Sequence, residues 1–354
     1  MSERCSFLVP GELGARTGGS TYDRHIIDGL RALGWHVDVR SLGEGWPAPG
    51  DAAMGVAREV LEGLPEDSLV VTDGLAFGAM PELAEAHATR LRWVALVHHP
   101  LALETGLDAS AQTLLFDSER RALATVRAVI VTSPATARAL ASYQVPASRI
   151  TVVEPGTEPA PLAAGSGSGD LQLLSVANLT PRKGHALLID ALAGLRDRRW
   201  VLHCVGSLTM DAACTAALVA AIDRHGLRDR VTLHGEQDEA ALRAFYARAD
   251  AFVLPSFHEG YGMALAEALA HGLPVISTTA GAIPDTVPAD AGELVPPGDG
   301  QALRTALQRL MDDPAWRERL AAGARAARDR LPTWADSAAR FASALEALET
   351  ASGE

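Results

Sequence analysis

Short apolar runs alternate with longer alanine-rich stretches along most of this chain. Six runs in the first half have the length of buried strands, at 5–9, 37–39, 69–71, 94–97, 128–131 and 150–153. Helical patterns separate most of them, beginning with a glycine-rich loop and a helix over about 21–33. This alternation is typical of a doubly wound parallel sheet, so the first half predicts a Rossmann-like α/β domain.

The pattern stops at residues 154–170, whose proline, glycine, serine and alanine content predicts a linker. It then restarts, with strands expected at 171–176, 200–205, 231–233, 251–254 and 274–277. Helices are expected at 301–311, 315–330 and 334–348. A chain of 354 residues exceeds what one core usually supports. We therefore predict an N-terminal domain at 1–160, a C-terminal domain at 168–332 and a last helix at 333–350.

The composition excludes several classes of partner. A formal net charge of −13 is the wrong sign for a nucleic-acid binder or for a protein held on an anionic membrane surface. Three scattered cysteines indicate neither a disulfide framework nor a zinc site. The sequence contains no apolar run of the roughly 18 residues that a membrane span needs, and no signal peptide. We expect a cytoplasmic protein without stable membrane insertion, and the oligomeric state stays open.

The segment 249–285 carries the strongest functional signal. An expected strand runs into a loop with Glu259, Gly260 and Gly262, and a helix that contains Glu267 follows. Backbone amides at a helix N-terminus favour phosphate binding, and ionised carboxylates suit sugar or ribose hydroxyls. The alternative is that the glycines only form a turn and that both glutamates face water.

Three further segments lie at the expected carboxyl ends of strands, where open α/β sheets bind ligands. Arg182 and Lys183, in 175–184, are suited to a diphosphate, although a solvated basic loop is the plainer alternative. The glycine-rich segment 10–20, with Gly18 and Gly19, fits either close approach to a ligand or an ordinary turn. His98, beside His99, can contact a sugar hydroxyl, transfer a proton or merely end the strand. No zinc spacing and no Asp-x-Asp pair is visible, so we expect neither a metal nor another cofactor.

Together these motifs resemble family 4 of the retaining glycosyltransferases, which have the GT-B architecture. Glu259 and Glu267 match the family's Glu-x7-Glu pair, and residues 181–184 match its basic motif. Residues 6–20 look like its N-terminal glycine loop, and His98 matches a histidine near the donor sugar. Asn178 departs from the pattern, since many members have an arginine there, and Asp285 stands where glutamate is frequent.

The resemblance implies two Rossmann-like domains facing a central cleft, with the last helix crossing back to the N-terminal domain. It implies retaining transfer of a hexose-type sugar from a nucleoside-diphosphate sugar, such as a UDP- or GDP-sugar, to a hydroxyl of a small molecule or saccharide. His98, Lys183 and Glu259 would act in catalysis. The donor would be held by Gly18, Gly19, Arg182, Lys183, Glu267 and backbone amides of Gly260, Tyr261, Gly262 and Met263.

Three other functions remain open from the sequence. A dinucleotide-dependent oxidoreductase would use a G-x-G-x-x-G fingerprint, but Leu265 stands where the third glycine belongs. A nucleotide-sugar epimerase could use the same architecture. A non-catalytic nucleotide-sugar-binding protein would keep the fold without turnover.

Overall fold

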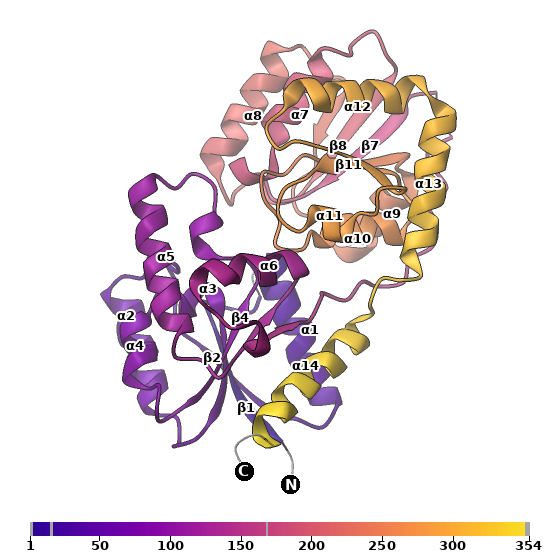
Figure 1. The fold of residues 1–354 in the computed structure, drawn as a ribbon. Coiled ribbons are helices and arrows are strands. Elements are labelled where there is room, and N and C mark those ends of the chain that lie inside the picture. Colours follow the sequence, from indigo (N-terminus) through magenta and orange to yellow (C-terminus); the bar gives the residue numbers. More distant parts are fainter. Residues whose placement is uncertain (1–2, 15–16, 168, 351–354) are drawn as a thin grey trace. The chain divides into compact units, whose positions relative to one another are not determined.

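A computed structural model describes residues 3–14, 17–167 and 169–350. The chain forms two compact units (Figure 1). Unit 1 comprises the residues up to Gly156 together with those from Pro332 onward, and unit 2 comprises Thr157–Leu331. Among the helices that the structure describes, none combines the length and apolar character needed to cross a bilayer.

Unit 1 is built on a six-stranded parallel sheet with the order β2-β1-β3-β4-β5-β6. Its strands are β1 (Arg4–Val9), β2 (His36–Ser41), β3 (Leu69–Asp73), β4 (Arg92–Val97), β5 (Ala128–Val131) and β6 (Ile150–Val152). Successive strand residues face opposite sides: Leu8 lies in one core, and Phe7 and Val9 lie in the other. Both faces are therefore covered, as parallel sheets require.

The helices of unit 1 divide between these two faces. One face is covered by α2 (Asp51–Glu62), α3 (Gly74–Phe77), α4 (Pro81–Ala86), α5 (Ala109–Leu123) and the 3₁₀ turn η2 (Leu140–Tyr143). The other is covered by α1 (Gly18–Ala32) and α14 (Trp334–Thr350). The last helix packs on the first at a close approach, because Gly29 leaves room for Ala338. The remaining helical elements of unit 1 are η1 (Leu101–Leu103), α6 (Pro134–Ala139) and η3 (Ala147–Arg149).

Unit 2 is also a six-stranded parallel sheet, with the order β12-β11-β10-β7-β8-β9. Its strands are β7 (Leu171–Val176), β8 (Trp200–Val205), β9 (Val231–Leu233), β10 (Ala251–Leu254), β11 (Val275–Thr278) and β12 (Gly292–Val295). This is the strand order of a dinucleotide-binding fold. From β7 the sheet grows first toward β9 on one side and then from β10 toward β12 on the other, so the order of addition reverses between the neighbouring parallel strands β7 and β10. That junction is the position at which such sheets bind ligands.

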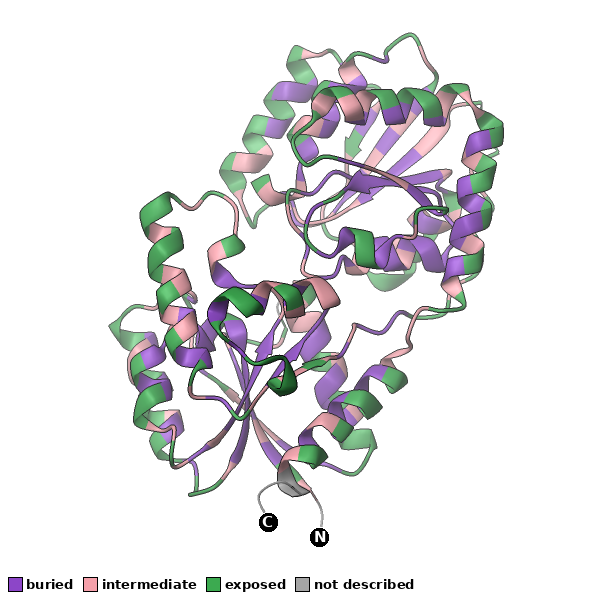
Figure 2. Cartoon of the chain, viewed as in Figure 1, coloured by how far each residue is buried: buried purple, intermediate pink, exposed green. Residues whose placement is uncertain are grey.

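The helices of unit 2 cover both faces of its sheet. They are α7 (His185–Ala193), α8 (Ala212–Arg224), α9 (Glu239–Arg248), α10 (Met263–Ala270), α11 (Ile283–Thr286), α12 (Gly300–Asp312) and α13 (Pro314–Arg328), with the 3₁₀ turn η4 (Pro181–Lys183). Strand residues are largely buried, and most helices expose one side (Figure 2). The expected fold class of two Rossmann-like α/β units is confirmed.

Two expectations about local structure were wrong. The sequence pattern missed β12, a short strand at the sheet edge whose two central residues are only half-buried. Gly18 and Gly19 were expected in a loop, but they form the first turn of α1. The helix begins early because the Thr17 side chain caps it and accepts a hydrogen bond from the Ser20 amide at 3.1 Å. Residues 15–16 of the expected glycine loop lie outside the described residues.

Candidate active site

The loops after β7 and β10 meet where the strand order of unit 2 reverses. The first contains η4 with Arg182 and Lys183, and the second contains Ser256 and Glu259. Two hydrogen bonds join them: the Phe257 amide donates to the Arg182 carbonyl at 2.8 Å, and the Arg182 guanidinium donates to the His258 carbonyl at 2.8 Å. The two loops are therefore joined to each other, and together they carry both cations and the carboxylate.

Glu259 is the centre of this charged group. Its Oε1 accepts hydrogen bonds from Lys183 Nζ at 2.7 Å and from Ser256 Oγ at 2.6 Å. Its Oε2 lies 3.6 Å from the Arg182 guanidinium. Burial raises the pKa of Glu259, but the charges of Lys183 and Arg182 outweigh burial and keep that pKa below its ordinary value. The carboxylate is therefore ionised at neutral pH and neutralised by two cations.

The backbone around Glu259 leaves no room for side chains at two glycines. Gly184 has a φ of +70° and faces the Pro255 carbonyl. Gly281, with a φ of +57°, faces the Glu259 backbone, and the next amide, that of Ala282, donates to the Glu259 carbonyl at 2.9 Å. A Cβ at either position would collide with backbone and displace one loop from the other.

Glu267 lies on α10 and belongs to a different contact. Tyr246, from α9, donates its hydroxyl to Glu267 Oε2 at 2.8 Å, and the tyrosine ring stacks on His271 at 4.9 Å. Burial raises the pKa of Glu267, which the tyrosine hydrogen bond partly offsets. The two predicted glutamates therefore differ: Glu259 is held by cations, and Glu267 is held by a neutral donor.

Gly260, Tyr261, Gly262 and Met263 connect Glu259 to α10. Gly262 precedes the helix with a φ of +93°, and Met263 is its first residue. The Tyr261 carbonyl accepts a hydrogen bond from the Thr286 hydroxyl at 2.6 Å, which fixes this segment to α11. The first amides of a helix lack intrahelical acceptors and suit an anionic ligand.

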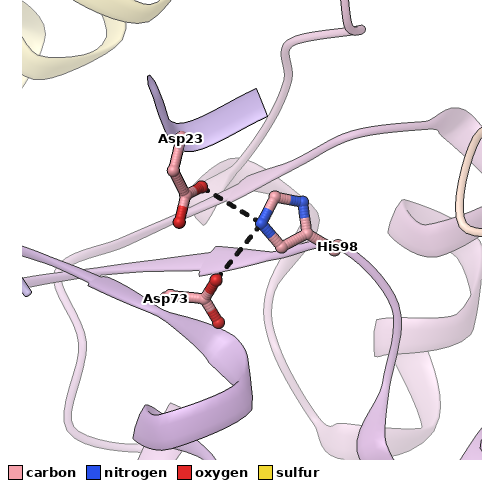
Figure 3. A group of neighbouring side chains, drawn as sticks. All are labelled: Asp23, Asp73 and His98. Atoms are coloured by element: carbon pink, nitrogen blue, oxygen red, sulfur yellow. Dashed lines mark hydrogen bonds and ion pairs between the residues drawn. The ribbon is translucent and has the colours of Figure 1, made fainter. Parts of the chain in front are cut away.

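His98 lies at the carboxyl end of β4 in unit 1, within a second charged group (Figure 3). Its Nε2 lies 3.2 Å from Asp23 Oδ1, on α1, and 3.4 Å from Asp73 Oδ2, at the end of β3. Gly19 belongs to the same site, because a Cβ there would lie 3.3 Å from the His98 ring. Gly18 precedes it in the first turn of α1. Gly19 thus allows the first turn of the helix to lie against the imidazole.

Sequence reasoning missed four residues of these sites: Asp23, Asp73, Tyr246 and Ser256. Asp73 had a usable signal, since it is the last residue of the apolar strand β3, and His98 directly follows β4. Asp23 and Tyr246 lie inside helices and carry no local signal. Asn178, the position that departs from the family pattern, accepts a hydrogen bond from the Ser207 amide at 2.9 Å. It therefore has a structural contact in place of the usual cation.

Comparison with known proteins agrees with the fold. The profile of the family described as "Glycosyl transferases group 1" matches residues 162–327, and that of "Glycosyltransferase Family 4" matches residues 68–160. A mannosyltransferase of Mycolicibacterium hassiacum, "MMP alpha-(1->4)-mannosyltransferase", is 27% identical over 318 residues, which are 85% of this chain and 76% of the relative. The chain belongs to the group 1 glycosyltransferases.

Other relatives match over a smaller part of their own length. A D-inositol 3-phosphate glycosyltransferase of Streptosporangium roseum is 30% identical over 71% of this chain and 64% of the relative. The chain spans about half the length of two others, from Thermobispora bispora and Frankia alni.

Solved structures share the fold over nearly the whole chain. Sucrose-phosphate synthase of Thermosynechococcus elongatus has a TM-score of 0.84 at 24% identity, covering 99% of this chain and all of the other. HepE of Anabaena, solved with UDP-glucose, has a TM-score of 0.77 at 18% identity, covering 97% and 99%. At these identities the likeness concerns the GT-B fold alone.

Proposed function

We propose that this protein transfers a hexose-type sugar from a nucleoside-diphosphate sugar to a hydroxyl of a small molecule or saccharide, with retention at the anomeric carbon. The observation that carries this proposal is the group formed by Arg182, Lys183 and Glu259 where the strand order of unit 2 reverses. Two cations suit the diphosphate, and the adjacent carboxylate suits the hydroxyls of the sugar attached to it.

The similar proteins support this class of donor and acceptor. HepE is described in complex with UDP-glucose, and the relatives include a mannosyltransferase and enzymes named for D-inositol 3-phosphate. A UDP- or GDP-linked hexose is therefore the proposed donor, and a small hydroxylated molecule is the first acceptor class to test. Membership of a glycosyltransferase family favours sugar transfer over the oxidoreductase and epimerase alternatives.

The residues take the following roles in this proposal. Arg182 and Lys183 hold the diphosphate, together with the amides of Gly260, Tyr261, Gly262 and Met263. Glu259 contacts the transferred sugar, and Glu267 holds the ribose. His98 contacts the donor sugar from unit 1, with Gly18 and Gly19 beside it.

The arrangement of Glu259 favours front-face displacement over a covalent intermediate. A nucleophilic carboxylate needs a free oxygen, but Oε1 of Glu259 accepts two hydrogen bonds and Oε2 faces Arg182. In the proposed step the acceptor oxygen bonds to the anomeric carbon on the face from which the diphosphate departs. The bond from that carbon to the phosphate oxygen breaks, and the departing oxygen receives the acceptor's proton. Lys183 and Arg182 stabilise the negative charge that develops on it.

We propose that this step needs no metal ion, because two side-chain cations already stand where a divalent ion would balance the diphosphate. Dialysis against EDTA should leave the rate within about twofold of the untreated enzyme. The assay is product formation before and after chelation, with Mn²⁺ and Mg²⁺ added back separately. A rate that is lost on chelation and restored by one of these ions would contradict metal independence.

Tyr246→Phe should weaken donor binding while leaving the chemical step nearly intact. The change removes the hydroxyl that orients Glu267, and losing one such hydrogen bond costs ~1 kcal/mol, equivalent to about a fivefold higher KM for the donor. Because that hydrogen bond lowers the pKa of Glu267, the pKa should rise further, and the loss should be larger at pH 5.5 than at pH 8. Steady-state kinetics at both pH values test this, with Tyr143→Phe in unit 1 as the control.

The function itself is tested by binding followed by product analysis. A thermal-shift panel of nucleoside diphosphates and their sugars should identify one base whose diphosphate raises the melting temperature. The matching nucleotide sugar is then incubated with candidate acceptors, and the anomeric coupling constant of the product is read by NMR. Stabilisation by a nicotinamide cofactor would reject the transferase assignment, and an inverted anomeric centre would reject retention. A bound nucleotide sugar that is neither transferred nor hydrolysed would indicate a binding protein.

A further inference from the structure

Two buried carboxylates converge on one nitrogen of His98. Asp23 is 1% exposed and Asp73 is 4% exposed, and both face Nε2 of the imidazole. Nδ1, the other ring nitrogen, points away from both carboxylates (Figure 3). The backbone of His98 is fixed too, because its carbonyl accepts a hydrogen bond from the Thr132 hydroxyl at 3.0 Å. Both the position and the rotation of the ring are therefore set by its neighbours.

Burying two carboxylates beside His98 lowers the stability of the fold unless each carboxylate has a partner. A buried carboxylate loses its hydration, and only a charged or hydrogen-bonding partner offsets that loss. Asp73 has a local reason to be present, since it caps α3 by accepting from the Leu75 amide at 2.6 Å. Asp23 lies within α1, away from its ends, and its partner is the histidine from β4, 75 residues away. The contact between α1 and the end of β4 thus gives Asp23 a partner that can carry positive charge.

The charges around the ring favour its protonated form. The groups that face it are Asp23 and Tyr22 on α1 and Asp73 on β3; the Tyr22 ring meets the imidazole edge-on at 5.4 Å. Burial alone would lower the pKa of His98, but the hydrogen bonds and charges of the two aspartates outweigh burial and raise that pKa to about 10. Burial and Asp73 raise the pKa of Asp23 to about 7, while the pKa of Asp73 is lowered.

We propose that Asp23 and Asp73 are positioning residues that hold His98 as an imidazolium, with Nε2–H directed at them and Nδ1–H presented to the ligand. This inference rests on the proposed contact between His98 and the donor. An imidazolium donates hydrogen bonds and accepts none, so His98 binds a hydroxyl or phosphate oxygen and cannot act as the base that deprotonates the acceptor. The proton of the acceptor then goes to the departing diphosphate.

The first test reads the ring directly in the ligand-free protein. An NMR titration of the histidine Cε1–H signals, assigned to His98 by comparison with His98→Gln, should show His98 charged up to at least pH 9. Asp23→Asn and Asp73→Asn should each move its midpoint down by at least one pH unit. Asparagine also caps helices, so Asp73→Asn preserves the start of α3. A midpoint near 6.5 in the unchanged protein overturns the proposal whether or not the variants fold.

The second test reads the consequence for activity. The kcat/KM of the unchanged enzyme should be flat from pH 7 to pH 9, and in the two variants it should fall within that range, because activity follows the charged form of His98. Glu104→Gln, which removes the partner of His99, is the control and should keep the flat profile. Variants with a lower but still flat profile would show a structural role only and would overturn the proposal. Failure of the donor contact alone would leave the NMR result intact, which separates this inference from the proposed function.

The third test addresses a metal ion, since the ligand atoms of Asp23, Asp73 and His98 all lie within 4.8 Å of one another. A divalent ion there would need a neutral imidazole. Elemental analysis of the purified protein and titration with Zn²⁺ should show no stoichiometric metal that depends on Asp73. Metal that is present in the unchanged protein and absent from Asp73→Asn would overturn the proposal of an imidazolium and would indicate a metal site.

Discussion

Lys183→Ala should lower kcat by about 10²- to 10³-fold, the loss that follows removal of one preorganised hydrogen-bond donor that stabilises charge in the transition state. The ammonium lies 2.7 Å from Glu259 Oε1, on the loop that joins β7 to α7, where the departing diphosphate is proposed to bind. Charge on that group grows as the bond to the sugar breaks, so the loss should fall on kcat more than on the donor KM. Steady-state kinetics with saturating acceptor measure both.

The choice of residue at this position supports the prediction. Lys183 is the only lysine in the sequence, and every other basic position holds arginine or histidine. A compact ammonium is a point charge with three rotatable donors, whereas a guanidinium is a planar fork. Lys183→Arg should therefore keep the net charge and still lose most of the activity, because the planar fork does not reproduce the contact of the ammonium with Glu259 Oε1, an oxygen that also accepts from Ser256.

The single lysine also gives a direct measure of ligand contact. An amine-reactive acylating reagent should modify Lys183 and the chain's α-amino group, and a bound nucleoside diphosphate should protect Lys183, as read by mass spectrometry. For the kinetics of Lys183→Ala, the matched control is Arg199→Ala, since Arg199 is an exposed cation of the same unit that pairs with Asp170. Near-normal turnover of Lys183→Ala, or acylation that the ligand does not slow, would remove Lys183 from the proposed site.

Much of the fold was predictable because the central strands of a parallel sheet covered on both faces are continuous apolar runs. The strand β4 is an example: its last five residues are buried, and the run in the sequence is equally plain. The strand β12 was missed for the opposite reason. It lies at the sheet edge, contains a glutamate, and buries only its first and last residues. Such a segment gives too little hydrophobic signal to distinguish it from a loop.

The contacts of the site were less predictable than its residues. Lys183 and Glu259 are 76 positions apart, and they meet because β7 and β10 are neighbours in the sheet. Strand order is a property of the tertiary fold, so the sequence identified each charged residue without its partner. Asp23 was missed altogether, because an aspartate beside Arg24 in a helix looks like a solvent-facing residue until His98 is placed against it.

Glu259→Gln should raise the affinity for the nucleoside diphosphate and lower the rate of turnover. In the ligand-free protein the carboxylate pairs with both Lys183 and Arg182, so a diphosphate must compete with it for the same two cations. Glutamine keeps the shape and removes the charge, and the nucleoside diphosphate alone should then bind roughly two- to tenfold more tightly. Turnover should nevertheless fall by about 10²-fold, because the charged contact with the transferred sugar is lost.

Two measurements decide this prediction. Calorimetric titration with the nucleoside diphosphate gives the affinity, and steady-state kinetics with the nucleotide sugar give kcat. Glu318→Gln is the control: Glu318 is an exposed carboxylate of unit 2 that pairs with Arg325, and its removal should change neither quantity. Weaker binding of the diphosphate to Glu259→Gln would mean that Glu259 orients the cations for the ligand instead of competing with it. Unchanged kcat would show that the carboxylate makes no contact with the sugar that matters in the transition state.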